Sequence, residues 1–313
     1  MRSFVGLMAI PQIDYHRPTE LKEALKLVNK LKEGCRIFAG GTALVPAARQ
    51  GKMSLSRGIH IVDISSIKEL DYVVKDGDMI RIGAVTKLSK IAESAVVREH
   101  APILADAASQ MGSLQIRNQG TIGGNLCNAS PAADTAPPLL ALDTMTNLRG
   151  VDKQRAVPLT EFFTGPGETI LESGEILAEI QIPIMGPTAG ACFIKLGRRN
   201  AFTLSVISVA TLVKIKDGIF DDVKVALGAV APTPIRALKA ERYLTGKKVN
   251  EQVIDEGAKI TGSEVRPICD VRASAEYRKD MSYIITKRAL NLSVQRVREG
   301  KVQSEENRKK QAR

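Results

Sequence analysis

The sequence predicts an α+β protein of two domains. Helical and strand patterns alternate through residues 1–185, but they do not form a regular series of parallel α/β units. A glycine-rich stretch at residues 37–44 lacks the third glycine of the G-x-G-x-x-G fingerprint, which argues against a Rossmann domain. Residues 183–190 hold two prolines and two glycines, a composition typical of a linker. We therefore expect a first domain at 1–185, with subdomains of about 1–57 and 58–185, and a second domain at 186–299.

The first domain opens with an amphipathic helix. Thr19 is a suitable N-cap residue, acidic side chains follow it in the first turn, and Gly34 ends the helix. The apolar face of this helix consists of Leu21, Ala24, Leu25, Val28 and Leu31. The patterns then predict a strand at 36–39, a helix at 43–49, a strand at 59–64, a hairpin of 72–74 with 79–82, helices at 87–99, 102–111 and 137–142, and strands at 144–149 and 176–182.

The second domain is predicted to contain a short sheet covered by helices. Its turn signal is Asp217-Gly218. Residues 300–313 are basic and poor in apolar side chains, so we expect a disordered tail. In chain order, the patterns predict strands at 191–195, 204–216 and 223–230, and helices at 236–244, 251–260 and 273–298.

Composition argues against several functions. The formal net charge is +11, but aromatic residues make up only 4% and tryptophan is absent, so nucleic acid is a poor candidate for a partner. No apolar run is long enough to span a bilayer. Residues 1–10 lack the long apolar core and the cleavage site of a signal peptide, and we therefore expect a cytoplasmic protein. The three histidines stand near no cluster of metal ligands or nucleophiles, so no metal or acid–base site is predicted.

The four cysteines are scattered along the chain. This spacing argues against a zinc site, a disulfide framework or an iron–sulfur cluster within the chain. We expect Cys35, Cys192 and Cys269 to be buried free thiols. Cys127 stands in a glycine-rich stretch, where it can pack against a ligand, and we assign it no redox role.

Two glycine-rich stretches are the candidate functional segments. The first is Ile37–Leu44, and the second, about eighty residues later, is Gly120–Asp134, which is expected to be a loop. Paired glycines let a backbone approach a ligand closely, and N–H groups in such loops can bind anions. Asp134 offers an acceptor for a ribose hydroxyl or, alternatively, an N-cap for the next helix. One such stretch is typical of a plain turn, whereas two predict a long phosphate-bearing ligand held from two sides.

These motifs resemble the FAD-binding subunit of the molybdenum hydroxylases, a family that includes xanthine dehydrogenase and aerobic carbon monoxide dehydrogenase. The resemblance covers nearly the whole chain, to about residue 299. It rests on Ala39–Thr42, Thr121–Asn125 and Ala129–Asp134, and it extends to Glu175–Leu177, Lys195–Arg199 and Ala275–Arg278.

The resemblance implies a vanillyl-alcohol-oxidase-like (PCMH-type) FAD-binding domain, followed by a domain like the C-terminal domain of the carbon monoxide dehydrogenase flavoprotein. We expect non-covalent FAD, because neither glycine-rich stretch contains a histidine. Lys195 is implied to lie near the flavin and Leu177 to contact it, although Lys195 with Arg198 and Arg199 could instead bind a nicotinamide cofactor or a partner, or form a solvated strand end. The implied cofactor-binding residues are Ile37, Phe38, Ala39, Gly40, Gly41, Thr42, Ala43, Leu44, Thr121, Ile122, Gly123, Gly124, Asn125, Asp134, Leu177 and Lys195.

The resemblance also implies partner subunits. A large subunit would hold molybdopterin, and a small subunit with two [2Fe–2S] clusters would pass electrons to the flavin. The acceptor after the flavin would be NAD⁺, a quinone or oxygen. We expect a heterotrimer or its dimer, in which this chain alone cannot oxidise the substrate.

Two alternatives stay open at this point. A self-contained flavin oxidase of the same superfamily would carry a larger substrate domain than the second domain of about 120 residues, and often a histidine bound to the flavin. A basic scaffold or nucleic-acid-binding protein would be colourless when purified and would bind DNA with a steep salt dependence.

Overall fold

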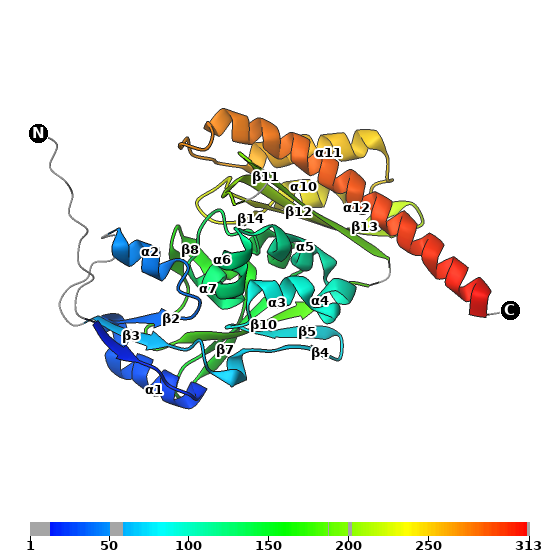
Figure 1. Ribbon diagram of the computed structural model, residues 1–313. Coiled ribbons are helices and arrows are strands. Elements are labelled where there is room, and N and C mark those ends of the chain that lie inside the picture. The colour runs from blue at the N-terminus through cyan, green and yellow to red at the C-terminus, as the bar shows by residue number, and fades with distance from the viewer. Residues whose placement is uncertain (1–12, 51–58, 187, 200–201, 312–313) are drawn as a thin grey trace, which may run out of the picture.

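The computed structural model describes residues 13–50, 59–186, 188–199 and 202–311, with side chains up to residue 300. Figure 1 shows three successive groups of elements: the N-terminal group in blue, a middle group in cyan and green, and a C-terminal group in yellow-green to red. Helices and separate sheets alternate along the chain, which confirms the predicted α+β class. The order of strands in these sheets shows how the two glycine-rich stretches meet.

The N-terminal group is a small parallel sheet with strand order β1-β3-β2. Helix α1 buries one apolar face on this sheet, as its sequence pattern predicts. The helix begins at Leu21 rather than at a Thr19 cap, and the backbone N–H of Thr19 donates to Glu23 instead, at 3.2 Å. Strand β3 lies after residue 57 yet pairs with both β1 and β2, so this sheet reaches past the expected subdomain boundary. The elements are β1 (Ile13–His16), α1 (Leu21–Leu31), η1 (Lys32–Gly34), β2 (Cys35–Phe38), α2 (Leu44–Arg49) and β3 (Ile59–Asp63).

The middle group is a five-stranded antiparallel sheet with strand order β4-β5-β10-β6-β7, covered by short helices. Its strands are β4 (Val73–Asp76), β5 (Met79–Gly83), β6 (Met145–Arg149), β7 (Gln154–Pro158) and β10 (Ile176–Pro183), and a separate hairpin is formed by β8 (Phe163–Gly165) and β9 (Glu168–Thr169). Its helices are η2 (Lys68–Leu70), α3 (Leu88–Glu93), α4 (Ala95–His100), α5 (Pro102–Gln110), α6 (Leu114–Gln119), α7 (Ile122–Cys127), α8 (Ala136–Ala141) and α9 (Leu159–Phe162).

The C-terminal group is a four-stranded sheet with strand order β11-β12-β13-β14. Helix α12 packs on β11 and β12, whereas α5 and α8 of the middle group contact β11, β12 and β13. Along β12, Ala210 and Leu212 join the core of the middle group, while Val209 and Val213 join the core beneath α12. This alternation leaves the strand buried on both faces. The elements are β11 (Ala189–Gly197), β12 (Ser205–Lys216), β13 (Ile219–Gly228), β14 (Ile235–Arg236), α10 (Leu238–Leu244), α11 (Glu251–Glu264) and α12 (Ala275–Gln311).

Several expected elements differ from the structure. The single helix expected at 87–99 is divided at Ser94, whose extended backbone ends α3 and whose hydroxyl then accepts from the Val97 N–H to begin α4. The second glycine-rich stretch is not a loop throughout, because it contains α7. Strand β7 was missed because it lies at the sheet edge and its sequence shows no apolar alternation.

The C-terminal tail also differs from expectation. Residues 301–311 continue α12 as helix instead of forming a disordered tail. Their lysine, glutamate, arginine and glutamine residues are good helix formers, and a single Gly300 costs a helix only about 1 kcal/mol. Cys269 is exposed rather than buried, because it lies in the segment between α11 and α12, where its sulfur accepts a hydrogen bond from the Ala275 N–H at 3.2 Å.

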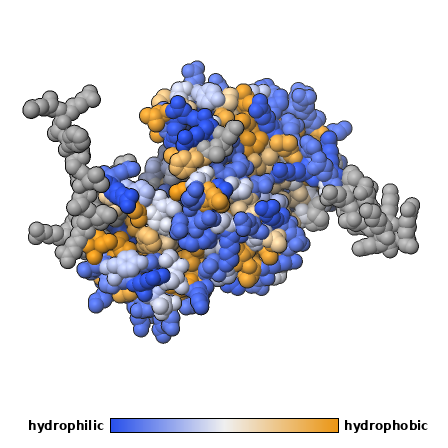
Figure 2. Space-filling view, in the orientation of Figure 1, coloured by the Kyte–Doolittle hydropathy of each residue, from blue (hydrophilic) through white to orange (hydrophobic). Residues whose placement is uncertain are grey.

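Hydrophilic residues cover most of the face shown in Figure 2, with hydrophobic residues in small groups between them. Within the described residues, no helix is long and apolar enough to cross a membrane.

Candidate functional site

A cavity of about 620 Å³ lies where the three groups of elements meet. All the residues predicted to bind the cofactor line it, except Phe38, Ile122 and Lys195. The first glycine-rich stretch supplies one wall, the second supplies another, and residues 202–204 of the C-terminal group contribute a third side. The fold therefore brings together two stretches that are far apart in sequence.

Gly40 allows the two glycine-rich stretches to touch. A Cβ atom at this position would lie 2.2 Å from the carbonyl oxygen of Gln119 and 2.9 Å from the Cα of Gly120. Both atoms belong to the backbone, so they cannot move aside as a flexible side chain could. A glycine is required here because one stretch packs directly on the other, whereas the sequence alone suggested close approach to a ligand.

The turn at Gly41 shapes the first wall. Gly41 has φ +69°, a conformation that other residues rarely adopt, and a Cβ there would lie 2.6 Å from the Phe38 ring. The backbone N–H groups of Gly41, Thr42 and Ala43 donate no hydrogen bond to any described part of the chain. This segment lines the cavity and is followed directly by α2. It therefore offers donors to a ligand.

The second stretch is built differently. The Thr121 hydroxyl caps α7 by accepting from the Gly124 N–H at 3.1 Å, while the N–H groups of Ile122 and Gly123 donate to Thr86 at 3.0 Å and to Ala84 at 2.8 Å. These donors are therefore already used within the protein. A Cβ at Gly123 would lie 2.7 Å from Ala84, so this glycine is also required by packing.

Gly124 is the glycine of the second stretch around whose Cβ position the fewest atoms lie. A Cβ there would meet only the Thr121 hydroxyl within 4 Å, at 2.8 Å, and the residue lines the cavity. Nearby, the Asn125 side-chain oxygen accepts a hydrogen bond from the Thr135 hydroxyl at 2.6 Å, which fixes its amide in place. This wall is thus rigid and mostly satisfied in its own hydrogen bonds.

Asp134 forms a buried ion pair between domains. Its carboxylate accepts from Lys195 Nζ at 2.6 Å and from the Ser205 hydroxyl, and the residue is 4% exposed. Burial raises the pKa of Asp134, although the Lys195 ammonium and the Ser205 hydroxyl act in the opposite direction. Lys195 also donates to the Gln110 carbonyl at 3.1 Å. Both carboxylate oxygens are therefore bound within the protein, and a contact with ribose stays a prediction.

Cys127 lines the cavity, as its place in the second stretch suggests. Burial raises the pKa of its thiol to about 12. The group is therefore a protonated thiol at neutral pH. Among the described residues, no group of three or more histidine, cysteine, aspartate or glutamate side chains could hold a metal ion.

Sequence reasoning missed several lining residues. Those within or near the second stretch share small size or glycine-rich surroundings and could have been found by extending the motif. Those from residues 111–112, α6, β10 and the 202–204 segment have no local signal, because the fold alone brings them to the cavity. Gly120, Cys127, Asn128, Ser130, Ala132 and Ala133 lie in the second stretch but are not among the residues named for the cofactor. The lining residues that lie outside the predicted site are Ala47, Ile64, Ala84, Leu88, Met111, Gly112, Ile116, Leu171, Ile176, Phe202, Thr203 and Leu204.

Two family sequence models match this chain. One describes the FAD binding domain in molybdopterin dehydrogenase and matches residues 11–185. The other describes the CO dehydrogenase flavoprotein C-terminal domain and matches residues 192–292. Together they account for most of the described chain and place the cavity largely within the first match.

Similar proteins cover nearly the same length. The chain is 33% identical over 279 residues to the glyceraldehyde dehydrogenase medium chain of Sulfolobus acidocaldarius, covering 89% of this chain and 97% of that one. It is 32% identical over 283 residues to the xanthine dehydrogenase FAD-binding subunit of Escherichia coli O157:H7, covering 90% and 95%. A chain of the solved carbon monoxide dehydrogenase of Hydrogenophaga pseudoflava matches with a TM-score of 0.88 and 31% identity, covering 92% and 99%.

Proposed function

The chain belongs to the family of FAD-binding subunits of the molybdenum hydroxylases, and on that premise we propose that it holds FAD non-covalently in the cavity where its two glycine-rich stretches meet. It is the electron-transfer flavoprotein of its complex, receiving electrons from a [2Fe–2S] subunit and passing them to an external acceptor. The relatives are named as medium chains or FAD-binding subunits, which favours this function over a self-contained oxidase.

The observation that carries the proposal is the contact between the two stretches across one large cavity. Its volume of about 620 Å³ falls within the range of about 300–1,000 Å³ usual for small-molecule and cofactor sites. Its walls combine apolar side chains such as Leu177 and Leu88 with backbone donors and small hydroxyl groups. Apolar walls suit the flavin and adenine rings, whereas the donors suit a pyrophosphate.

The N–H groups of Gly41, Thr42 and Ala43 would hold the pyrophosphate. No described residue that lines the cavity carries a positive charge, so the phosphate charge must be balanced by N–H dipoles. Asp134 is positioned by Lys195 and by the hydrogen bond from Ser205, and it would fix the wall from which the cofactor is contacted. All sixteen residues named from the sequence are proposed as the FAD site. Three of them do not line the cavity and act indirectly. Phe38 packs against Gly41, Ile122 supports the cavity wall, and Lys195 positions Asp134.

FAD accepts electrons singly and passes a pair onward as hydride when it is bound. The protein's own residues bind the cofactor, orient it and restrict the access of water. We assign the chemistry of substrate oxidation to other chains, because the relatives are named as medium chains or FAD-binding subunits.

We propose a large molybdopterin-binding subunit and a small [2Fe–2S] subunit as partners, in a cytoplasmic heterotrimer or its dimer, with NAD⁺ or another acceptor taking the electrons. We also propose a division into a FAD-binding domain at 1–185 and a C-terminal domain at 186–299. The matches at 11–185 and 192–292 support this division.

Gentle purification from the native source tests the proposed function. It should recover two further polypeptides, one with molybdenum and one with iron. Substrate should bleach the flavin absorbance in this complex but not in the isolated chain. A lone chain that is reduced by substrate would overturn the proposal and favour the oxidase.

A further inference from the structure

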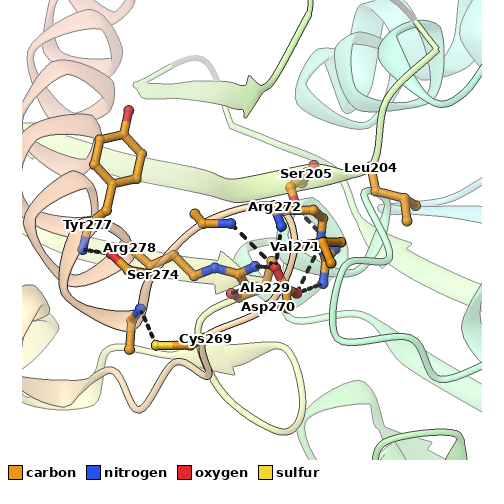
Figure 3. A network of polar contacts seen from close by, with 12 residues as sticks. Leu204, Ser205, Ala229, Cys269, Asp270, Val271, Arg272, Ser274, Tyr277 and Arg278 are labelled. Atoms are coloured by element: carbon orange, nitrogen blue, oxygen red, sulfur yellow. Dashed lines mark hydrogen bonds and ion pairs between the residues drawn. The ribbon is translucent and has the colours of Figure 1, made fainter.

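An ionic cluster in the C-terminal group consists of Asp270, Arg272 and Arg278 (Figure 3). Asp270 Oδ1 accepts from Arg278 Nη2 at 2.6 Å and from the Arg272 N–H at 2.8 Å, while its Oδ2 accepts from Arg272 Nε at 2.9 Å. Arg278 is 1% exposed, and its Nε has no hydrogen-bond partner among the described residues. A guanidinium this buried depends strongly on its carboxylate partner.

One line of contacts leads from this cluster to Asp134. Arg272 Nη1 donates to the Ser205 carbonyl at 3.2 Å, as Figure 3 shows. The Ser205 hydroxyl then donates to Asp134, which lines the cavity. The guanidinium of Arg272 is thus linked to the cavity wall through a single serine.

A second line leads to Pro131. Arg278 Nη1 donates to the Ala229 carbonyl at 2.8 Å, and the Ala229 N–H donates to the Pro131 carbonyl at 2.6 Å. Ala229 has φ +64°, a strained conformation for a residue with a Cβ, so it persists only because its surroundings hold it. The hydrogen bonds made by the N–H and by the carbonyl of Ala229 provide that restraint.

The two lines converge on Ser130–Asp134, of which Ser130, Ala132, Ala133 and Asp134 line the cavity. Asp270, Arg272 and Arg278 do not line it themselves. We propose that the Asp270–Arg272–Arg278 cluster is a positioning device of the C-terminal domain that holds this wall in the shape that binds FAD. This inference rests on the proposed function, since it requires that the cavity bind FAD.

The pKa of Asp270 lies well below its usual range because Arg272 and Arg278 hydrogen-bond to the carboxylate. The cluster therefore stays charged across the physiological pH range. Neither arginine is exposed enough to rearrange freely, and each donates to a backbone carbonyl as well as to Asp270. Loss of one member should therefore loosen the wall without removing any group that touches the cofactor.

The chain offers a matched control in the same domain. Asp255 accepts from the Tyr283 hydroxyl at 2.7 Å and from Lys287 at 2.6 Å, and so joins α11 to α12. Like Asp270 it bonds to cationic side chains, but no hydrogen bond or ion pair among the described residues leads from it to the cavity. Asp255→Asn therefore removes a comparable ionic hub without a path to the FAD site.

The test compares Arg272→Met, Asp270→Asn and Asp255→Asn. FAD binding to each apo-protein is titrated by quenching of FAD fluorescence, and unfolding of the apo-protein is followed in urea. Arg272→Met removes the side-chain hydrogen bonds to Asp270 and to the Ser205 carbonyl. It should raise the Kd for FAD about tenfold, which is within the range by which residues without ligand contact alter binding. Asp255→Asn should leave the Kd within about twofold even where it lowers apo-protein stability to the same extent.

The outcomes separate the inference from the proposed function. A wild-type chain that binds no FAD overturns the proposed function itself. A wild-type chain that binds FAD, with Arg272→Met binding equally well, overturns the positioning role alone. If Asp270→Asn does not fold because Arg278 is left as an uncompensated buried charge, Arg272→Met and its control still decide the question.

Discussion

Substitution of Gly40 by alanine tests whether direct contact between the two glycine-rich stretches builds the cavity. The new Cβ would lie 2.2 Å from the Gln119 carbonyl oxygen and 2.8 Å from its carbon. Relief requires the two backbones to separate by about 1.2 Å, the difference between 2.2 Å and an ordinary contact of 3.4 Å. Overpacking of this kind costs about 1–3 kcal/mol.

The displacement acts on both walls of the cavity at once, since Gly40 and Gly120 both line it. We therefore expect Gly40→Ala to raise the Kd for FAD at least tenfold, which corresponds to about 1.4 kcal/mol of binding free energy. Fluorescence titration of the apo-protein measures the Kd, and urea unfolding measures the stability.

Gly34→Ala is the matched control. It lies in the same N-terminal group, at the end of η1, and nothing stands within 4 Å of the position its Cβ would take. Its stability should change by less than about 1 kcal/mol, and FAD binding should be unaffected. If Gly40→Ala binds FAD within twofold of the wild type, the two stretches do not need to touch for the cavity to bind the cofactor.

Three further predictions concern single residues. Gly124→Val should leave a folded chain, because the new Cβ meets only the hydroxyl that caps the same helix. It should weaken FAD binding by about ten- to a hundredfold, because the valine side chain fills part of the cavity. Full flavin occupancy would show that this residue does not face the cofactor. The hydrogen bond from Arg155 is the main cause that lowers the pKa of Glu175 from 4.5 to about 2. The contribution of Glu175 to stability should therefore be complete above about pH 4.5 and should be lost as the pH falls towards 2. Glu175→Gln should therefore be less stable than the wild type by about 2–3 kcal/mol at pH 7, and a difference in unfolding free energy that does not narrow in acid would contradict this. Alkylation at pH 8 should modify the exposed Cys269 but not Cys127, whose pKa is about 12; mass spectrometry that finds Cys127 modified first would contradict the raised pKa of its thiol.

The sequence located the site because each glycine-rich stretch is a local signal. Gly41 illustrates this, since a turn with φ +69° favours glycine whatever lies around it. The reason for Gly40 could not be inferred from sequence, because it depends on Gln119, about eighty residues away. The sequence therefore indicated that Gly40 matters but could not show that it packs on Gln119.

Other parts of the site are set by the arrangement of the domains. Residues 202–204 line the cavity only because β12 begins beside Asp134, and no periodicity or composition in that segment indicates it. Ser205 shows the same limit, because its hydroxyl is ordinary in the sequence and becomes significant only through Asp134 and Arg272. Helix α7 of the second stretch was missed because glycine, threonine and asparagine are weak helix formers, and tertiary contacts and the Thr121 cap overcome that weakness.

Identification of the bound cofactor tests the proposed non-covalent FAD site most directly. The purified chain is precipitated with acid, and the supernatant is analysed by chromatography and absorbance. We expect a yellow supernatant that contains FAD in about equimolar amount to the chain, because the cavity binds one cofactor without a covalent link. Flavin that stays in the pellet, FMN in place of FAD, or a chain that neither contains flavin nor takes up added FAD would contradict it.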